Sequence, residues 1–133
     1  MKEVTKYLKN HCPNTKGKCA RYVRKALEAC GLKINGSQPN SACRYSAHLP
    51  YWGFDLVYEG NVGSNNNDYQ PQNGDIAVIA GITNAQEKDM HGHIHVYNSD
   101  DKGWYSDFKA KTIHVYASPK GRPYKVYRKR QLA

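Results

Sequence analysis

Cys19 is placed where a thiol can act as a nucleophile. Apolar residues recur at three- and four-residue spacing from Cys19 to Cys30, which predicts an amphipathic helix that Asn14 or Thr15 can cap. A cysteine in the first turn of a helix lies beside unpaired backbone N–H groups and the positive end of the helix dipole, and both favour the thiolate. First-turn cysteines are also often inert packing residues, so the position needs support from elsewhere in the chain.

That support comes from a strand-like segment that carries two histidines. In the sequence Gly-His-Ile-His-Val-Tyr at residues 92–97, Ile94 and Val96 are expected to face the core, and His93 and His95 the opposite way. His93 follows a glycine at the start of this segment, which favours it as a general base. The alternative is that His93 is a solvated residue at the edge of a strand.

A third polar group is expected to hold the imidazole in its orientation, and Asp107 in the following strand-like segment is the candidate. One register across the connection places Asp107 opposite His95, and a shift by two residues places it opposite His93. In both registers Asp107 shares a sheet face with the histidines, and Phe108 points to the other face. The sequence does not choose between them.

These residues must be positioned by a helix and a set of strands. The helix is expected to end at Gly31, residues 37–63 predict one short helix and then an irregular or extended stretch, and residues 63–74 read as an exposed loop. A period of two then predicts strands at 75–80, 93–98, 104–108, 112–116 and 124–128. A helix followed by an antiparallel meander indicates an α+β fold with helices on one side of a twisted sheet.

Length and charge bound the architecture and the partner. A chain of 133 residues without a linker fits a single catalytic domain, residues 1–133. Lysine and arginine outnumber aspartate and glutamate by 20 to 11, and part of the excess lies in residues 120–130. The net charge of +9 implies a polyanionic partner such as nucleic acid, an acidic membrane or a carboxylate-bearing cell wall, unless the basic end serves only solubility.

Targeting signals and cysteine spacing add two expectations. The chain has no run near the roughly 20 apolar residues that cross a bilayer, and its start lacks the apolar core of a secretory signal. We therefore expect synthesis in the cytoplasm without a signal peptide. No C-x-x-C pair occurs, and one disulfide among Cys12, Cys30 and Cys43 is left open.

Three segments stand in a recognisable order: Lys-Cys-Ala-Arg-Tyr-Val at 18–23, Pro-Gln-Asn-Gly-Asp-Ile-Ala-Val at 71–78, and Gly-His-Ile-His-Val at 92–96. Together they resemble the NlpC/P60 and CHAP superfamily of peptidoglycan amidases and endopeptidases, and most of all the amidase effectors of type VI secretion and phage CHAP enzymes. The resemblance spans residues 15–108. It implies a papain-like fold in which N-terminal helices pack on a five- to six-stranded antiparallel sheet.

The resemblance also implies roles for individual residues. Cys19 would be the nucleophile, His93 the base and Asp107 the orienting residue, without a metal or a cofactor. The implied substrate contact is Tyr22, one turn along the helix. Independently of the resemblance, the basic residues Lys18, Arg21 or Arg44 are expected to hold substrate carboxylates at the edge of the cleft. Lys18 departs from the family pattern, in which the residue before the cysteine is often acidic or an amide.

The function implied by the resemblance is hydrolysis of peptidoglycan stem peptides at the bond from γ-D-glutamate to diaminopimelate. The enzyme would be an antibacterial secreted effector or a phage lytic enzyme that reaches the cell wall by export or lysis. We expect a monomer with an immunity protein as partner, and no membrane or nucleic-acid partner.

Two rival functions start from other features of the sequence. A zinc hydrolase would use His91, His93 and His95, which alternate along one strand. A basic RNA-binding protein or ribonuclease would use the net charge and the eleven tyrosines, although no RNP-like or helix-turn-helix pattern occurs.

Overall fold

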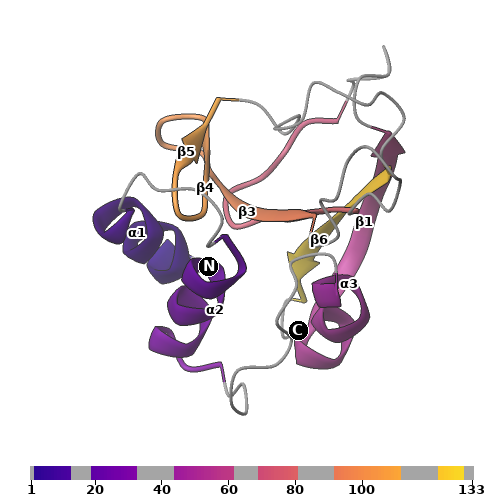
Figure 1. Ribbon diagram of the computed structural model, residues 1–133, viewed down its shortest axis with the longest axis horizontal. Helices are drawn as coiled ribbons and strands as arrows, with labels where there is room; N and C mark the ends of the chain where they lie inside the picture. Colours follow the sequence, from indigo (N-terminus) through magenta and orange to yellow (C-terminus); the bar gives the residue numbers. More distant parts are fainter. Residues whose placement is uncertain are drawn as a thin grey trace, which may run out of the picture.

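The structure, a computed structural model, describes residues 2–12, 19–32, 44–61, 69–80, 92–111 and 123–130, without the side chains of Cys19 and Asn61. The helices are α1 (Lys2–His11), α2 (Cys19–Ala29) and the one-turn α3 (Tyr45–His48), which continues into the 3-10 turn η2 (Leu49–Trp52). The strands are β1 (Phe54–Asn61), β2 (Ile76–Ile79), β3 (His93–Asn98), β4 (Gly103–Tyr105), β5 (Lys109–Ala110) and β6 (Pro123–Lys129) (Figure 1).

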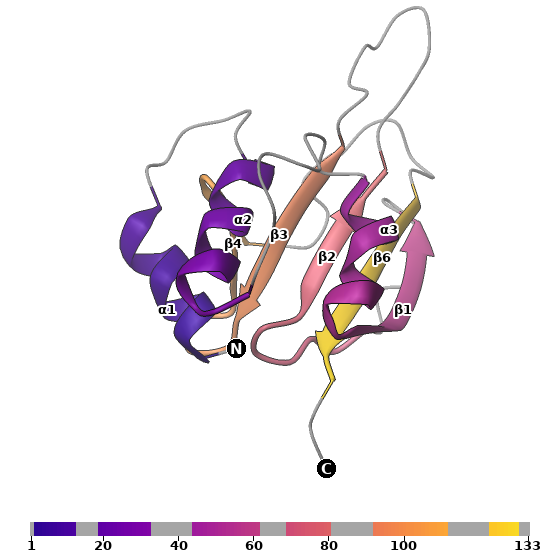
Figure 2. The same cartoon turned by 90° about the horizontal axis from the view of Figure 1, so that it is seen from below.

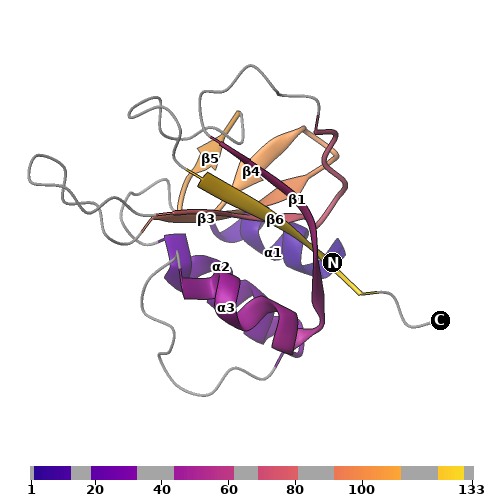
Figure 3. The same cartoon turned by 90° about the vertical axis from the view of Figure 1, so that its right-hand side faces the viewer.

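The strands form one antiparallel sheet in the order β1-β6-β2-β3-β4-β5. Figure 3 shows this sheet nearly edge-on, with α1, α2 and α3 all on the same side of it. The predicted α+β fold, with helices on one face of a five- to six-stranded antiparallel sheet, is therefore confirmed.

Each face of the sheet carries its own apolar cluster. On the helix side, Leu8 of α1 and Val23 of α2 are buried with Ile94 and Val96 of β3. On the other side, the buried cluster consists of Ala77, Ile79, Trp104, Tyr124 and Val126. Because both faces are covered, β2 is buried at every position and reads as a continuous apolar run.

Helix α2 forms where the apolar spacing predicts it, with Val23, Ala26 and Leu27 buried. It ends as expected at Gly31, which has a φ of 103°. The Gly31 N–H donates to the Glu28 carbonyl at 3.1 Å, and the Leu32 N–H donates to the Leu27 carbonyl at 3.0 Å. These two hydrogen bonds form a Schellman motif at the end of the helix. The motif requires a residue that tolerates a left-handed backbone, which is Gly31 here.

Most predicted strands are confirmed, and one is wrong. β2, β3 and β6 lie within or around the predicted segments 75–80, 93–98 and 124–128, and residues 54–61 are extended. The predicted strand 104–108 is broken, because β4 ends at Tyr105 and residues 106–108 form a bend before β5. The predicted strand 112–116 and the candidate caps Asn14 and Thr15 lie outside the described residues. Helix α1 was not predicted.

A buried ion pair fixes the start of β2. Asp75, fully buried, accepts hydrogen bonds from Arg128 Nε at 2.9 Å and from an Arg128 terminal nitrogen at 3.1 Å. The Gln72 N–H donates to the same carboxylate at 2.8 Å, and the Tyr69 hydroxyl also donates to it. Asp75 therefore ties the loop before β2 to β6, and the Gly-Asp segment at 74–75 serves the fold.

None of the described helices is long and apolar enough to cross a membrane.

Candidate functional site

The candidate residues are carried by elements that begin at one end of the molecule. Figures 2 and 3 both show the first turn of α2, the first turn of α3 and the start of β3 at the same end, with α2 packed along β3. Cys19 is the first residue of α2, His93 is the first residue of β3, and Arg44 directly precedes α3. The fold thus brings together residues that lie far apart in the sequence.

His93 and His95 form a buried pair. Their side chains are 3% and 0% exposed, His93 Nε2 lies 3.2 Å from His95 Nδ1, and the ring planes are perpendicular with centroids 4.7 Å apart. His93 pairs with Ile79 across the sheet and His95 with Ala77, so both imidazoles lie on the face opposite the helices, as the alternation predicts. The histidines are not solvated edge residues.

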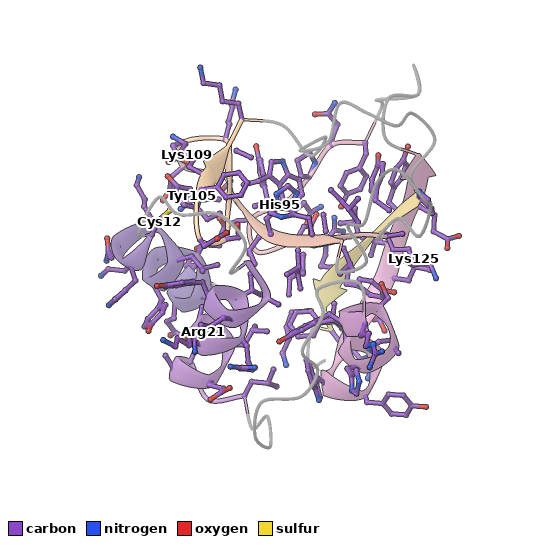
Figure 4. All side chains as sticks on the ribbon, in the orientation of Figure 1. Cys12, Arg21, His95, Tyr105, Lys109 and Lys125 are labelled. Carbon is purple, nitrogen blue, oxygen red and sulfur yellow. The ribbon has the colours of Figure 1, made fainter. Side chains whose placement is uncertain are left out.

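Aromatic rings fix the positions of both imidazoles. The His95 ring stacks on Trp104 with centroids 4.6 Å apart and an interplanar angle of 29°, and the His93 ring contacts Phe108 at 5.4 Å. Figure 4 shows His95 on the side of β3 away from the helices. The sequence predicts a role for His95 only in the zinc alternative, although its place two residues after His93 on the same strand face predicts that their rings are neighbours.

The register between β3 and β4 differs by one residue from the first register that the sequence suggests. Asn98 pairs with Gly103 and Tyr97 with Trp104, so neither predicted alignment of Asp107 with a histidine holds. The connection is one residue shorter than expected because Lys102 adopts a left-handed backbone with a φ of 58°, which lets Gly103 join the strand. Phe108 therefore lies on the His93 side of the sheet, and the prediction that it faces the other way is wrong.

Asp107 lies in the bend after β4, at the end of the sheet where β3 begins. It is fully buried and accepts a hydrogen bond from Ser106 Oγ at 3.1 Å. The Ser106 N–H donates to the Phe108 carbonyl at 3.0 Å, which closes the bend around Asp107. Asp107 is therefore in the same region as His93, but its place is set by this bend and not by a strand register.

The remaining candidates are placed in part. Tyr22 is half-buried on α2, packs against the helix-side core, and lies under Lys25 Nζ at 5.4 Å from the ring centre. Arg44 is exposed. Lys18 and the side chain of Cys19 lie outside the described part of the structure.

Two of the other cysteines are free thiols and do not pair with each other. Cys12 follows α1, and Cys30 follows α2. Burial, together with the nearby Glu3, raises the pKa of the Cys30 thiol. Cys43, the third cysteine considered for a disulfide, lies outside the described residues, as does His91 of the zinc alternative. Among the described residues, no three His, Cys, Asp or Glu side chains converge as metal ligands would.

Comparison with known proteins gives one informative match. No family model matches the sequence, and no curated protein matches it. A chain in the crystal structure of the type VI native effector-immunity complex Tae3-Tai3 from Ralstonia pickettii is 30% identical, with a TM-score of 0.68 and 96% of each chain covered. The chain belongs to the Tae3 effector family.

Membership in the Tae3 family confirms the part of the sequence resemblance that pointed to type VI effectors. The wider assignment to NlpC/P60 or CHAP stays a prediction. Identity over nearly the whole chain also means that the match includes α2 and β3, the two elements that carry Cys19 and His93.

Proposed function

We propose that this Tae3-family protein is a cysteine hydrolase that cleaves amide bonds in the stem peptides of bacterial peptidoglycan, as an antibacterial effector. The observation that carries the proposal is the meeting of the first turn of α2, which begins at Cys19, with the start of β3, which begins at the buried His93. A cysteine that opens a helix and a histidine that opens the neighbouring strand are typical of papain-like enzymes, which supports the NlpC/P60 interpretation. Because the His93 ring lies on the sheet face away from the helices, the two side chains would meet around the end of the sheet where both elements begin.

The proposed reaction uses the thiol and the imidazole in two steps. The Cys19 thiolate attacks the amide carbonyl carbon, and backbone N–H groups at the start of α2 stabilise the resulting oxyanion. His93 then gives its proton to the leaving amine as the C–N bond breaks, which leaves a thioester on Cys19. Water, losing a proton to His93, attacks the thioester, and the acid product leaves as the thiol or thiolate is restored. Asp107 is proposed to orient His93.

His93 suits the role of base better than His95 for a positional reason. A strand residue approaches the first turn of α2 only if it lies near the end of the sheet where both elements begin. His93 is the first residue of β3, whereas His95 lies two residues further along, about 7 Å deeper in the sheet. The half-buried Tyr22 would then border the substrate from the next turn of α2.

The proposed bond joins γ-D-glutamate to diaminopimelate. It lies between free carboxylates, which the basic residues Lys18, Arg21 and Arg44 would hold at the edge of the cleft. Since the related Tae3 is known in complex with the immunity protein Tai3, we propose that this protein also has an immunity partner. We also propose that the protein is exported and acts in the periplasm of a target cell.

Digestion of purified peptidoglycan tests activity class and bond together. Wild type is compared with Cys19→Ala, and the products are identified by mass spectrometry; Cys12→Ala, Cys30→Ala and Cys43→Ala serve as matched controls. We expect soluble fragments with a new free amine on diaminopimelate, made by wild type and the three controls but not by Cys19→Ala. Hydrolysis by Cys19→Ala refutes the thiol mechanism. Intact peptidoglycan together with shortened RNA in a parallel incubation favours the ribonuclease alternative.

A further inference from the structure

Exposed lysines gather on α1 and on the neighbouring edge of the sheet. Three of them are spaced along α1 so that they form a single stripe on one side of the helix. The others flank the β4–β5 hairpin. We call this set the lysine surface, and its members are Lys2, Lys6, Lys9, Lys102, Lys109 and Lys111.

The two halves of the lysine surface are contiguous. Lys9 Nζ of α1 and Lys109 Nζ of β5 approach the same oxygen of Asp101, at 3.6 Å and 3.3 Å. Burial works to raise the pKa of Asp101, but hydrogen bonds from Tyr105, Lys109 and a backbone N–H outweigh it and lower the pKa. Figure 4 shows Lys109 and Tyr105 beside Cys12 at the end of α1.

The charge of this surface is unbalanced, unlike that of the opposite edge of the sheet. The same elements carry three acids, Glu3 of α1 and Asp100 and Asp101 of the β3–β4 connection, which against six lysines leaves a surplus of three positive charges. At the other edge, Lys125 pairs with Glu59 and Arg130 with Asp55. Within the described residues, no carboxylate pairs with the lysines at positions 2, 6, 102 and 111.

The lysine surface lies away from the candidate site: Lys9 and Lys109 meet at Asp101 in the β3–β4 connection, at the far end of β3 from His93. From there the lysines continue along α1, a helix about 15 Å long at 1.5 Å per residue. A ligand that engages all of them must therefore be longer than the segment that is cut.

We propose that the lysine surface docks intact peptidoglycan through its many stem carboxylates, so that the enzyme prefers the polymer to short fragments. The identity of the polymer rests on the proposed function. Lysines on an edge strand such as β5 can also serve only to block edge-to-edge pairing. That role does not account for the stripe on α1, which is a helix.

Two variants with equal charge change test this. Lys2→Gln/Lys6→Gln/Lys9→Gln removes three positive charges from the surface, and Lys125→Gln/Lys129→Gln/Arg130→Gln removes three from the opposite edge. Binding to sacculi is measured by co-sedimentation in the Cys19→Ala background, where nothing is cut. We expect roughly tenfold weaker binding and a weaker salt dependence for the surface variant only. With Cys19 restored, cleavage of a soluble disaccharide-peptide should be unchanged.

Three outcomes overturn the docking surface: unchanged binding by the surface variant, equal loss in the control variant, or tighter binding to anionic phospholipid vesicles than to sacculi. Binding that depends on the lysines without any hydrolysis by wild type would instead overturn the proposed function and leave the surface standing.

A separate observation, the contact between the two histidines, concerns how the base is held. His95 is fully buried, its Nδ1 lies 3.2 Å from His93 Nε2, and its ring is stacked on Trp104. Its cross-strand neighbour, Ala77, is small and fully buried. The His95 ring therefore presents Nδ1 to His93 from a fixed position.

We infer that His95 is a positioning residue for His93, in addition to Asp107, and that it acts through the contact between the two rings. When His93 is protonated, both of its ring nitrogens are donors, so His95 Nδ1 must accept and His95 must be neutral with its proton on Nε2. This hydrogen bond stabilises the His93 imidazolium and directs Nδ1 of His93 to proton transfer. The inference rests on the proposed function.

The pH dependence of kcat/KM separates this role from a structural one. Its alkaline limb reports loss of the proton from His93. His95→Leu should lower kcat/KM by roughly 10- to 100-fold and move that limb to lower pH, because the acceptor for the imidazolium is gone. His95→Asn, whose amide oxygen can accept, should restore the limb.

Asp107→Asn and His93→Ala complete the set. The inference is overturned if Asp107→Asn moves the alkaline limb of the kcat/KM profile and His95→Leu does not. It is also overturned if His95→Leu and His95→Asn lose equal activity and neither moves that limb. Full activity of His93→Ala would overturn the proposed function itself.

Discussion

Removal of either partner of the Asp75–Arg128 ion pair should destabilise the protein, but by unequal amounts. Arg128→Met leaves a fully buried carboxylate whose remaining donors, among the described residues, are the Tyr69 hydroxyl and the Gln72 N–H. Leaving one partner of a buried ion pair as an uncompensated charge costs about 3–5 kcal/mol. Asp75→Asn leaves the Arg128 guanidinium, whose side chain is 33% exposed and stays hydrated, so we expect about 2 kcal/mol.

The double variant Asp75→Asn/Arg128→Met tests the reasoning most directly, since it leaves no charge at this site. It should be more stable than Arg128→Met alone by at least about 1 kcal/mol. Urea unfolding, followed by fluorescence of the two tryptophans, gives the free energy of unfolding from midpoints at a common slope. A larger loss for Asp75→Asn than for Arg128→Met, or additive losses in the double variant, would refute the assignment of the cost to the buried carboxylate.

Two further predictions concern stability. Burial raises the pKa of Tyr124 to about 12 and raises the pKa values of Tyr69 and Tyr105. Above about pH 10 the unfolded chain releases tyrosine protons that the folded state retains. The free energy of unfolding should therefore fall as pH rises. A urea midpoint that stays constant from pH 9 to about 12 would contradict this prediction. Gly60→Ala places a Cβ 2.8 Å from the buried Tyr124 ring and should lower the free energy of unfolding by about 1–3 kcal/mol. The Cβ of Gly31→Ala meets no atom within 4 Å, so this variant should lose about 1–2 kcal/mol from the positive φ alone. Thermal unfolding of both variants checks these values.

The sequence predicts those parts of the fold in which one local period dominates. Helix α2 and strand β3 are confirmed because their apolar residues follow the helical and the alternating spacing over their whole length. Helix α1 was missed because only Val4 and Leu8 among its residues are buried and apolar, which leaves a weak pattern among lysines. The nearness of Cys19 and His93 along the sheet was predictable only through the family resemblance.

The register between β3 and β4 could not be predicted from the spacing of residues within either strand. Gly103 reads as a turn residue in the sequence, but it is the first residue of β4, where a Cβ would lie 2.7 Å from Lys109 Cε and 3.1 Å from an Asp101 oxygen. A Cβ at this position would displace the end of the Lys109 side chain, and the left-handed backbone of the connection falls on Lys102 instead. The nearest of these atoms belongs to Lys109 on β5, which no spacing rule within β4 can reveal. The His93–His95 hydrogen bond likewise depends on ring orientations that Trp104 and Phe108 impose.

Strand β6 comes last among the described strands but lies inside the sheet, between β1 and β2. A nascent chain on the ribosome therefore holds β1 and the β2–β3 pair as separate pieces until the segment 123–129 has left the exit tunnel. Before that moment Arg128 is absent and Asp75 has no cationic partner, so the loop before β2 is not anchored. The sheet is thus completed only when β6 has been translated, and a chain truncated before β6 cannot join its two halves.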